Sequence, residues 1–387
     1  MMQKTRILIL FGGRSAEHEV SVISARSVCR ALDRDRYAPV LVGIDRDGRW
    51  LFGGRDETML SAQDVTGPQS ALVRLGNRPG ELAVHDGGNV EGGEFDVVFP
   101  LLHGPYGEDG AVQGLLELAG VPYVGAGVAA SAVGMDKELA RAVFSAAGLP
   151  QTRFVVIRRS HWRKSPSLVV QEVERTFDYP LFVKPANLGS SVGISKVRDR
   201  DQLVEGLNHA GVYDTKILIE VAVEAAREIE CAVLGEENPE VSGVGEIVPG
   251  AEFYDYRTKY IDDCATLVIP ADLPEGTVKE VQEMSIRAFR AIDCSGLARV
   301  DFLIGQDGGI LLSEINTMPG FTPISMYPKL WQAAGLDYPD LIDKLIQLAL
   351  VRKSQRRDLK TTLSSAGDTG FIAGSSQADR KRPLDRT

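Results

Sequence analysis

The 387-residue sequence predicts an α/β protein of two or three domains, with a parallel sheet in its amino-terminal domain. The chain is longer than one compact core usually accommodates. Apolar strand-like runs alternate with helical patterns over its first third, which is typical of a parallel α/β sheet. Further along, strand patterns joined by glycine-rich turns indicate antiparallel hairpins.

The first strand is predicted at residues 7–11, which form a continuous apolar run. A helical pattern follows at residues 20–32, and Gly12 and Gly13 lie in the turn between them. Backbone N–H groups in such a turn, together with the positive end of the helix, favour an anion. The spacing is not that of a dinucleotide fingerprint. Glu17, beside the turn, either binds an amine or complements the helix dipole.

The rest of this domain continues the alternation of strands and helices. We expect strands at residues 40–44, 95–102 and 121–124, and a helix at residues 111–119. Residues 45–93 have weak periodicity and are interpreted as surface excursions. The polar, glycine-rich residues 103–110 follow a predicted strand, and α/β sheets bind ligands at such carboxyl ends.

A hairpin at residues 179–194 carries groups that suit nucleotide phosphates. The elements expected before it are a helix at 135–147, a strand at 152–157 and a helix at 167–176. Lys184 lies on its first strand, and Ser190 and Ser191 lie in its glycine-rich loop. Ammonium, hydroxyl and backbone N–H donors suit the β- and γ-phosphates. The alternative is a flexible serine-rich hairpin without a ligand.

Residues 216–220 and 229–234 are interpreted as paired strands with carboxylates at their ends. Glu220 and Glu228 could bind an adenine amino group and ribose hydroxyls, although solvated strand ends look the same in sequence. Residues 250–264 form an aromatic and basic segment without an apolar face, which is typical of a functional lid.

A second hairpin, at residues 297–316, is predicted to hold Mg²⁺. Alternation places Asp301 on one strand face and Glu314 and Asn316 on one face of the partner strand, with Arg299 at the rim. Carboxylate and carbonyl oxygens are the ligands that Mg²⁺ prefers. The alternative is the polar face of an ordinary antiparallel pair.

The carboxyl-terminal elements are predicted as packing elements. We expect a core helix at residues 274–292, a loop at 321–328, an amphipathic helix at 338–352 and disorder beyond about residue 363.

Composition limits the function classes. A hydrophobic content of 44% and a charged content of 25% are typical of a globular protein. The net charge of −10 argues against a nucleic-acid surface. The longest apolar runs have strand length, so we expect no membrane span. Residues 1–6 lead into the first strand without a signal-peptide pattern, and the four cysteines lack metal or redox spacing, which predicts a cytoplasmic protein.

Seven separated motifs together resemble the D-alanine–D-alanine ligases of the ATP-grasp superfamily. They lie at residues 12–21, 102–110, 135–137, 184–193, 254–260, 299–301 and 314–320. One motif alone is moderately specific, but seven in the same order are not expected by chance. The resemblance covers residues 7–352.

The resemblance implies a three-domain ATP-grasp fold and ATP-dependent joining of two D-alanines through an acylphosphate, for peptidoglycan precursor synthesis. ADP and phosphate would be released, two Mg²⁺ ions (or Mn²⁺) would assist, and the chain would form a homodimer. The implied bounds are a Rossmann-like substrate domain at 1–125, a central ATP-grasp subdomain at 126–219, a carboxyl-terminal ATP-grasp subdomain with the metal site at 220–353 and a disordered tail at 354–387.

Matching positions imply roles for individual residues. The metal ligands would be Asp301, Glu314 and Asn316. The nucleotide contacts would be Lys137, Lys184, Ser190, Ser191, Glu220, Ala222, Val223, Glu228 and Lys259. The D-alanine contacts would be Glu17, His103, Arg299, Gly320 and Ser325. A hydrogen-bonded trio of Glu17, Ser190 and Tyr260 would close the lid, and the resemblance thus favours the amine-binding role for Glu17.

Two other functions stay open. The first is a related ATP-grasp ligase that makes D-alanine–D-lactate or D-alanine–D-serine; Tyr260 argues against lactate, because the lactate enzymes typically lack tyrosine there. The second is a non-enzymatic ATP- or metal-binding regulator, and the full set of charged residues argues against it.

Overall fold

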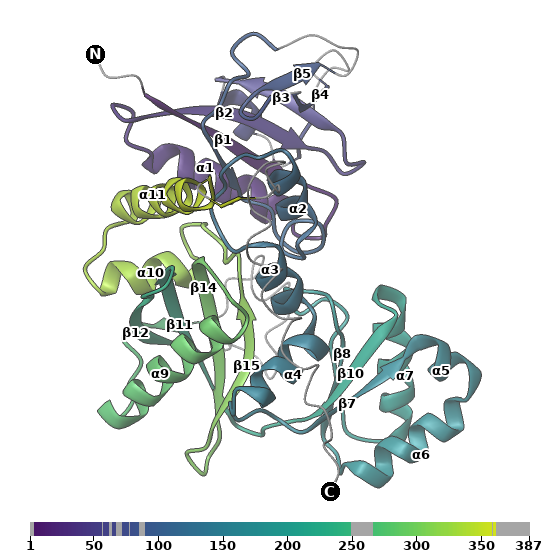
Figure 1. The fold of residues 1–387 in the computed structure, drawn as a ribbon. Helices are drawn as coiled ribbons and strands as arrows, with labels where there is room; N and C mark the ends of the chain where they lie inside the picture. The colour runs from purple at the N-terminus through teal and green to yellow at the C-terminus, as the bar shows by residue number, and fades with distance from the viewer. Residues whose placement is uncertain are drawn as a thin grey trace, which may run out of the picture.

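The computed structural model describes residues 4–55, 57–61, 64–66, 72–76, 78–84, 90–248, 266–357 and 359–360. These residues form three main sheets, and Figure 1 shows the amino-terminal sheet at the top, the carboxyl-terminal sheet at the lower left and the central sheet at the lower right. Three helices run between the sheets, namely α2 (Ala111–Leu118), α3 (Val128–Met135) and α4 (Lys137–Ala146).

The amino-terminal sheet is mainly parallel. Its strand order is β3 (Trp50–Gly54), β2 (Tyr37–Ile44), β1 (Thr5–Gly12) and β6 (Val97–Pro100). β1 pairs in parallel with β2 and β6, and β3 pairs antiparallel with β2. Helix α1 (His18–Ala31) packs on β1. Because the chain reaches β2 on one side of β1 and β6 on the other, the carboxyl ends of β1 and β6 form the crevice where such sheets bind ligands.

The central sheet is antiparallel and has its own core. Its strand order is β7 (Phe154–Arg158), β10 (Lys216–Val221), β8 (Leu181–Pro185) and β9 (Ser195–Val197). α5 (Arg159–Lys164), α6 (Pro166–Thr176) and α7 (Arg200–Tyr213) bury one face of this sheet. Alternate residues, including Phe182, Lys184 and Glu220, lie on the opposite face and line a cavity.

The carboxyl-terminal sheet is also antiparallel. Its strand order is β13 (Thr266–Val268), β12 (Glu240–Val248), β11 (Arg227–Gly235), β14 (Gly296–Ile304) and β15 (Ile310–Asn316). Helix α9 (Glu275–Ala291) packs on one face and α10 (Met326–Ala333) on the other. This sheet therefore has a buried core on both sides.

The last helix, α11 (Tyr338–Arg357), joins the amino-terminal and carboxyl-terminal sheets into one apolar core. Its Arg352 side chain is buried and donates hydrogen bonds of 2.6 Å to the Tyr123 and Gly125 carbonyl oxygens and to Ser295 Oγ. The Arg352 guanidinium also lies 4.7 Å from the centre of the Tyr123 ring. The amino-terminal and carboxyl-terminal sheets thus form one packed body. The central sheet, which has a separate core, forms a second body.

Three element predictions were wrong. Residues 216–220 and 229–234 do not pair with each other, because β10 belongs to the central sheet and β11 to the carboxyl-terminal sheet. Residues 45–93 include β3, a full member of the main sheet, and the two-stranded sheet of β4 (Val73–Leu75) and β5 (Leu82–Val84), with a short 3₁₀ helix, η1 (Glu57–Leu60). The loop predicted at residues 321–328 ends where α10 begins at Met326.

Smaller differences concern element ends. Residues 121–124 form only an isolated bridge, from Tyr123 to Val98. Helix α11 continues to Arg357, beyond its predicted end at residue 352. The predicted lid at residues 250–264 and the predicted disorder after residue 363 lie outside the described residues. The predicted domain bounds stay predictions.

None of the described helices has the length and apolar character needed to cross a membrane. Cys29, Cys231 and Cys294 are buried and form no disulfide, and burial raises the pKa of the Cys29 and Cys231 thiols to about 12. These three thiols are therefore protonated packing groups. Cys264 lies outside the described residues.

Candidate active site

The hairpin of β14 and β15 brings the predicted metal ligands together. Asp301 pairs with Glu314 across the ladder, and Arg299 pairs with Asn316. Ile315 is buried on the opposite face, so the alternation along β15 is as predicted. The prediction that this hairpin sets Asp301 beside Glu314 is therefore confirmed.

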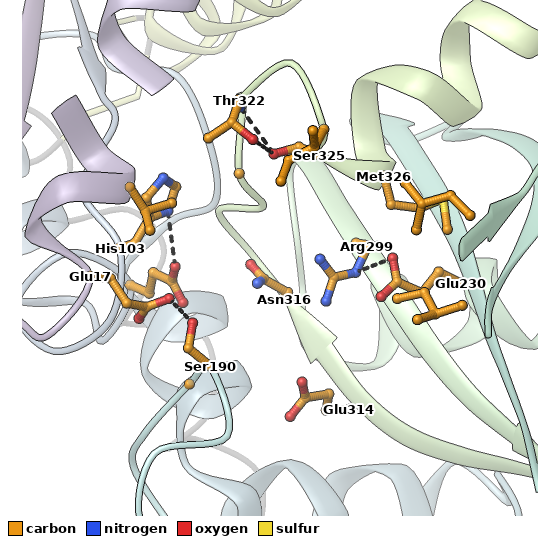
Figure 2. Close-up of a pocket in the computed structure, with 17 residues that line it drawn as sticks. Glu17, His103, Ser190, Glu230, Arg299, Glu314, Asn316, Thr322, Ser325 and Met326 are labelled. Carbon is orange, nitrogen blue, oxygen red and sulfur yellow. Dashed lines mark hydrogen bonds and ion pairs between the residues drawn. The ribbon is translucent and has the colours of Figure 1, made fainter. Parts of the chain in front are cut away.

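Arg299 lines the cavity drawn in Figure 2, which shows its contact with Glu230. It donates to Asp301 through Nε (2.7 Å) and Nη2 (2.6 Å), and its Nε lies 2.9 Å from Glu230 Oε2. Burial lowers the pKa of Arg299, but Asp301, Glu230 and Glu314 outweigh this effect and raise it well above its usual value. Its guanidinium is thus a fixed positive charge in the cavity, further inside than the predicted rim.

The donor set on this hairpin suits a hard cation. Asp301 and Glu314 supply carboxylate oxygens, and Asn316 supplies an amide oxygen that Met318 N–H orients at 3.0 Å. The described residues contain no group of three or more His, Cys, Asp and Glu side chains that could hold a metal alone. The residues fit Mg²⁺ because this ion commonly takes one or two carboxylates and completes its shell with phosphate oxygens and water.

Glu17 and Ser190 meet across the cavity from this hairpin (Figure 2). Ser190 Oγ, from the glycine-rich loop, donates a hydrogen bond to Glu17 Oε1. Ser15 Oγ holds the Glu17 backbone by accepting from its N–H at 3.1 Å. A Cβ at Gly104, whose φ is +72°, would lie 2.7 Å from Glu17 Oε2. The positive φ and this close approach to the Glu17 carboxylate both favour glycine at position 104.

His103 is buried beside Glu17 and forms a pair with Glu108. Its Nδ1 lies 3.4 Å from Glu108 Oε1 and 3.2 Å from the Met318 carbonyl oxygen, and its Nε2 lies 3.1 Å from Ser24 Oγ. Burial lowers the pKa of His103, but the hydrogen bond and charge of Glu108 outweigh it and leave the pKa raised. Burial also raises the pKa of Glu108. The pair thus places a buried imidazole and a buried carboxyl group together at the edge of the cavity.

The loop after β15 places Gly320 and Ser325 on the same cavity. Ser325 Oγ accepts a hydrogen bond from Thr322 N–H at 3.0 Å and lies 2.8 Å from Thr322 Oγ1. A Cβ at Gly320 would lie 2.8 Å from Ser325 Oγ. Glycine at this position therefore lets the loop backbone lie against the serine hydroxyl.

A larger cavity of about 580 Å³ lies beside the first, between the central and carboxyl-terminal sheets. Its volume is in the range of small-molecule sites. Of the predicted nucleotide contacts, the structure places Lys137, Lys184, Ser190, Ser191, Glu220, Val223 and Glu228 on its wall. Ala222 is not on the wall, and Val221 is. Glu314 and Ser190 line both cavities, so the two are adjacent.

The cations of this cavity are held by the protein's own acceptors. Lys137 Nζ donates to the Leu188 carbonyl oxygen at 2.7 Å and lies 3.6 Å from Glu314 Oε2. Lys184 Nζ forms an ion pair with Glu220. The glycine-rich loop that follows Lys184 has Ser190 at φ +50° and Ser191 at φ +58°. Two successive non-glycine residues in the left-handed backbone conformation cost free energy. Such strain is typical of a backbone constrained for binding.

Some residues around the cavities were missed by the sequence analysis. Glu108 lies inside the motif at residues 102–110, and its place in the motif could have identified it. Glu230 lies two residues after Glu228 on β11, opposite Asp301, so strand alternation could have identified it. The same cavity is also lined by the apolar residues Val20, Ile247, Leu267, Ile324 and Met326. Lys259 and Tyr260 lie outside the described residues.

Comparisons with known proteins match both halves of this arrangement. The family model described as the D-ala D-ala ligase N-terminus matches residues 6–126, and the one described as the D-ala D-ala ligase C-terminus matches residues 143–347. A D-alanine–D-alanine ligase of Acetivibrio thermocellus is 47% identical over 369 residues, which cover 91% of this chain and 97% of that protein. One of Bacillus cytotoxicus is 45% identical over 365 residues, 94% of this chain and 100% of that protein.

Solved structures show the same architecture. The D-alanine–D-alanine ligase of Coxiella burnetii aligns with a TM-score of 0.79 and 36% identity, covering 92% of this chain and 97% of that one. The VanG D-Ala:D-Ser ligase of Enterococcus faecalis aligns with a TM-score of 0.78 and 33% identity, covering 90% and 100%. The predicted ATP-grasp fold is therefore confirmed. The chain belongs to the D-alanine–D-alanine ligase family.

Proposed function

We propose that this protein joins two D-alanine molecules into D-alanyl-D-alanine at the expense of ATP, and so supplies a precursor of peptidoglycan. ATP phosphorylates the carboxylate of the first D-alanine, and the amine of the second attacks the resulting acylphosphate. The tetrahedral intermediate then releases phosphate. A site that stabilises this charge needs fixed cations and donors away from bulk water.

One observation carries the proposal: an amino-acid-sized cavity and a nucleotide-sized cavity meet at Glu314 and Ser190. A phosphoryl group passing between them would move beside the acidic hairpin. The cavity walls also offer the opposite charges that a zwitterionic substrate needs, with Glu17 on one side and Arg299 on the other (Figure 2). This charge separation supports an amino acid as the substrate.

We assign roles on this basis. Glu17 binds the ammonium of the first D-alanine, and His103 lies beside it. Arg299 and the Gly320 N–H stabilise the oxyanion, and Ser325 binds the carboxylate of the second D-alanine. Lys137, Lys184 and Lys259 bind phosphates. Glu220, Val223 and Glu228 contact adenosine, with Ala222 behind them. Ser190 and Tyr260 hold the closed state with Glu17.

Asp301, Glu314 and Asn316 would hold two Mg²⁺ ions, for which Mn²⁺ substitutes. Bound there, the ions would neutralise phosphate charge during phosphoryl transfer. We also propose that the protein acts in the cytoplasm as a homodimer.

Phosphate release from ATP and Mg²⁺ tests the reaction, with D-alanine, L-alanine or D-lactate plus D-alanine as substrates and mass spectrometry of the products. We expect release that depends on D-alanine and yields the dipeptide. Turnover with another amino acid only would contradict the substrate assignment. No turnover with any of them would favour an ATP- or metal-binding regulator.

A related ligase of D-alanine with D-serine or D-lactate is the second candidate, because the VanG structure shares this architecture. Tyr260 bears on this choice. We expect Tyr260→Phe to loosen closure and to raise the ratio of ester to amide product when D-lactate competes with D-alanine. Tyr213→Phe, at a half-exposed tyrosine on α7, is the matched control. An unchanged product ratio in Tyr260→Phe would contradict this role.

A further inference from the structure

Glu220 lies on the inner wall of the nucleotide cavity, and its two oxygens have different partners. Oε2 accepts hydrogen bonds from Arg141 Nη2 and from Thr152 Oγ1 (2.9 Å). Oε1 instead forms the ion pair with Lys184 Nζ. Glu220 and Lys184 line the cavity, whereas Arg141 and Thr152 do not. One oxygen is therefore fixed from behind, and the other is directed at the ligand space.

Arg141 is built into the protein interior. Its side chain is 3% exposed and that of Glu220 is 4% exposed. Arg141 Nη1 donates to Thr152 Oγ1 at 2.8 Å, so arginine, threonine and glutamate form one closed group. The guanidinium also lies 5.0 Å from the centre of the Phe154 ring. Because of this packing, the Arg141 side chain does not reach the cavity. Arg141 can therefore act on a ligand only through Glu220.

Lys184 can pair either with Glu220 or with a bound phosphate. Glu220 therefore needs Arg141 as a second cation. In the proposed function Lys184 binds phosphates, so nucleotide entry would draw it away from Glu220. A buried carboxylate without a cation takes up a proton, because burial disfavours its charged form. Arg141 remains when Lys184 leaves. The charged and titratable groups that face Glu220 are Arg141 from α4 and Lys184 from β8, and Thr152, before β7, adds a hydroxyl.

The protonation state of Glu220 determines which purine fits. An ionised carboxylate can only accept hydrogen bonds, which suits the 6-amino group of adenine. A protonated carboxyl group can donate to the 6-oxo group of hypoxanthine or guanine. We propose that Arg141 is a positioning residue that keeps Glu220 ionised and thereby makes the nucleotide site select adenine over 6-oxopurines. The inference rests on the proposed nucleotide role of Glu220.

The pKa of Glu220 is consistent with this role. Burial raises it, but the charges of Lys184 and Arg141 outweigh burial and lower the pKa to about 2. If Lys184 binds a phosphate instead, Arg141 is the cation of this pair that still opposes the effect of burial on the pKa of Glu220.

The test is titration calorimetry of the full chain with Mg²⁺-ATP and Mg²⁺-ITP, without D-alanine, between pH 6 and pH 8. We expect Arg141→Met to lower the ratio of ATP to ITP affinity by about tenfold or more, since a hydrogen bond to a charged group is lost. The ratio should fall further towards pH 6, as Glu220 takes up a proton. Arg141→Lys should preserve the ratio. Arg158→Met, at an arginine whose side chain is 58% exposed, is the matched control and should not change it.

An unchanged ratio in folded Arg141→Met, or an equal and pH-independent loss of both nucleotides, would overturn the inference, because a merely structural role predicts equal loss. If Arg141→Met does not fold, Glu220→Gln is compared with the Arg141→Met/Glu220→Gln double variant. Equal ratios in these two would support action through Glu220, and a further fall in the double variant would overturn it. Wild-type protein that binds neither nucleotide would instead overturn the proposed function itself.

Discussion

Glu314 is one of the residues that line both cavities, and it pairs with Asp301 across the hairpin. We expect Glu314→Gln to lower kcat by about 100-fold or more, because it removes a charge at the proposed metal site without changing side-chain volume. The melting temperature should stay within about 3 °C of wild type. Steady-state kinetics and thermal unfolding check this. Glu283→Gln, at an exposed glutamate on α9, is the control, and wild-type turnover in Glu314→Gln would refute the metal assignment.

Gly320 lies against Ser325 in the cavity that we propose binds the second D-alanine. A Cβ there would lie 2.8 Å from Ser325 Oγ, so Gly320→Ala must displace the serine or the loop. We expect kcat/KM for the second D-alanine to fall by about tenfold to 100-fold. Gly243→Ala on β12, where a Cβ would meet no heavy atom within 4 Å, is the control. Equal kinetics in the two variants would show that Ser325 does not bind substrate.

The placement of the candidate site residues was predictable where motif and strand alternation agree. Asp301, Glu314 and Asn316 follow from alternation alone once the hairpin is assumed. Arg141 was not predictable, because it lies on a helix face and meets Glu220 only through the tertiary fold. Arg141 and Glu220 lie 79 residues apart in the sequence, so no local sequence pattern connects them.

At the scale of elements, Asp214 joins the end of α7 to the hairpin at residues 179–194. Its carboxylate accepts from Asn187 N–H (2.8 Å), Asn187 Nδ2 (3.0 Å) and Lys216 N–H (3.1 Å). Burial raises the pKa of Asp214, but these hydrogen bonds outweigh it and lower the pKa below its ordinary value of 3.8. At pH values between the folded-state pKa of Asp214 and 3.8, the folded state therefore binds fewer protons than the unfolded state. The stabilisation is present above pH 3.8 and is lost as the pH falls through the folded-state pKa.

We expect Asp214→Asn to remove this pH-dependent part of the unfolding free energy. The free energy of unfolding in urea, measured between pH 2.5 and pH 6, should fall less steeply below pH 3.8 than in wild type. Asp201→Asn, at an exposed aspartate on α7, should leave the wild-type slope. Parallel curves for Asp214→Asn and wild type would contradict the assignment.

Helix α11 depends on Arg352 for its polar contacts. We expect Arg352→Met to lower the free energy of unfolding by about 2–4 kcal/mol, because two buried carbonyl oxygens and Ser295 Oγ lose their donor. Arg357→Met, at an exposed arginine of the same helix, should change it by less than about 0.5 kcal/mol. Urea unfolding measures both. Equal effects would mean that the buried contacts contribute no more than surface ones.

Elements were predictable where periodicity is strong. Helices α6 and α9 and strands β1 and β15 lie close to their predicted positions. The pairing of β10 with β11 was wrong because two apolar runs close in sequence resemble a hairpin, whereas the chain crosses between sheets at residues 222–226. Helix α10 was missed because Pro328 lies in its first turn, where a proline is tolerated but reads as a loop.

At the scale of the whole molecule, the amino-terminal and carboxyl-terminal sheets share one core, and the central sheet has its own. The larger cavity, the proposed nucleotide site, lies between these two bodies. The sequence predicted three domains in this order, but not that α11 makes one body of the first and third. That contact joins residues more than 200 positions apart, for example Arg352 and Tyr123, and periodicity carries no information about it.

The hydrogen bond from Ser190 to Glu17 joins the two bodies at the point where the cavities meet. An amino acid that engages Glu17 and a nucleotide that engages the Ser190 loop thus share one contact. Thermodynamic linkage then requires reciprocity: by whatever factor D-alanine changes the affinity for ATP, ATP changes the affinity for D-alanine by the same factor. Through this one serine contact, the concentration of ATP in the cell would affect how much D-alanine is bound, and the concentration of D-alanine would affect how much ATP is bound.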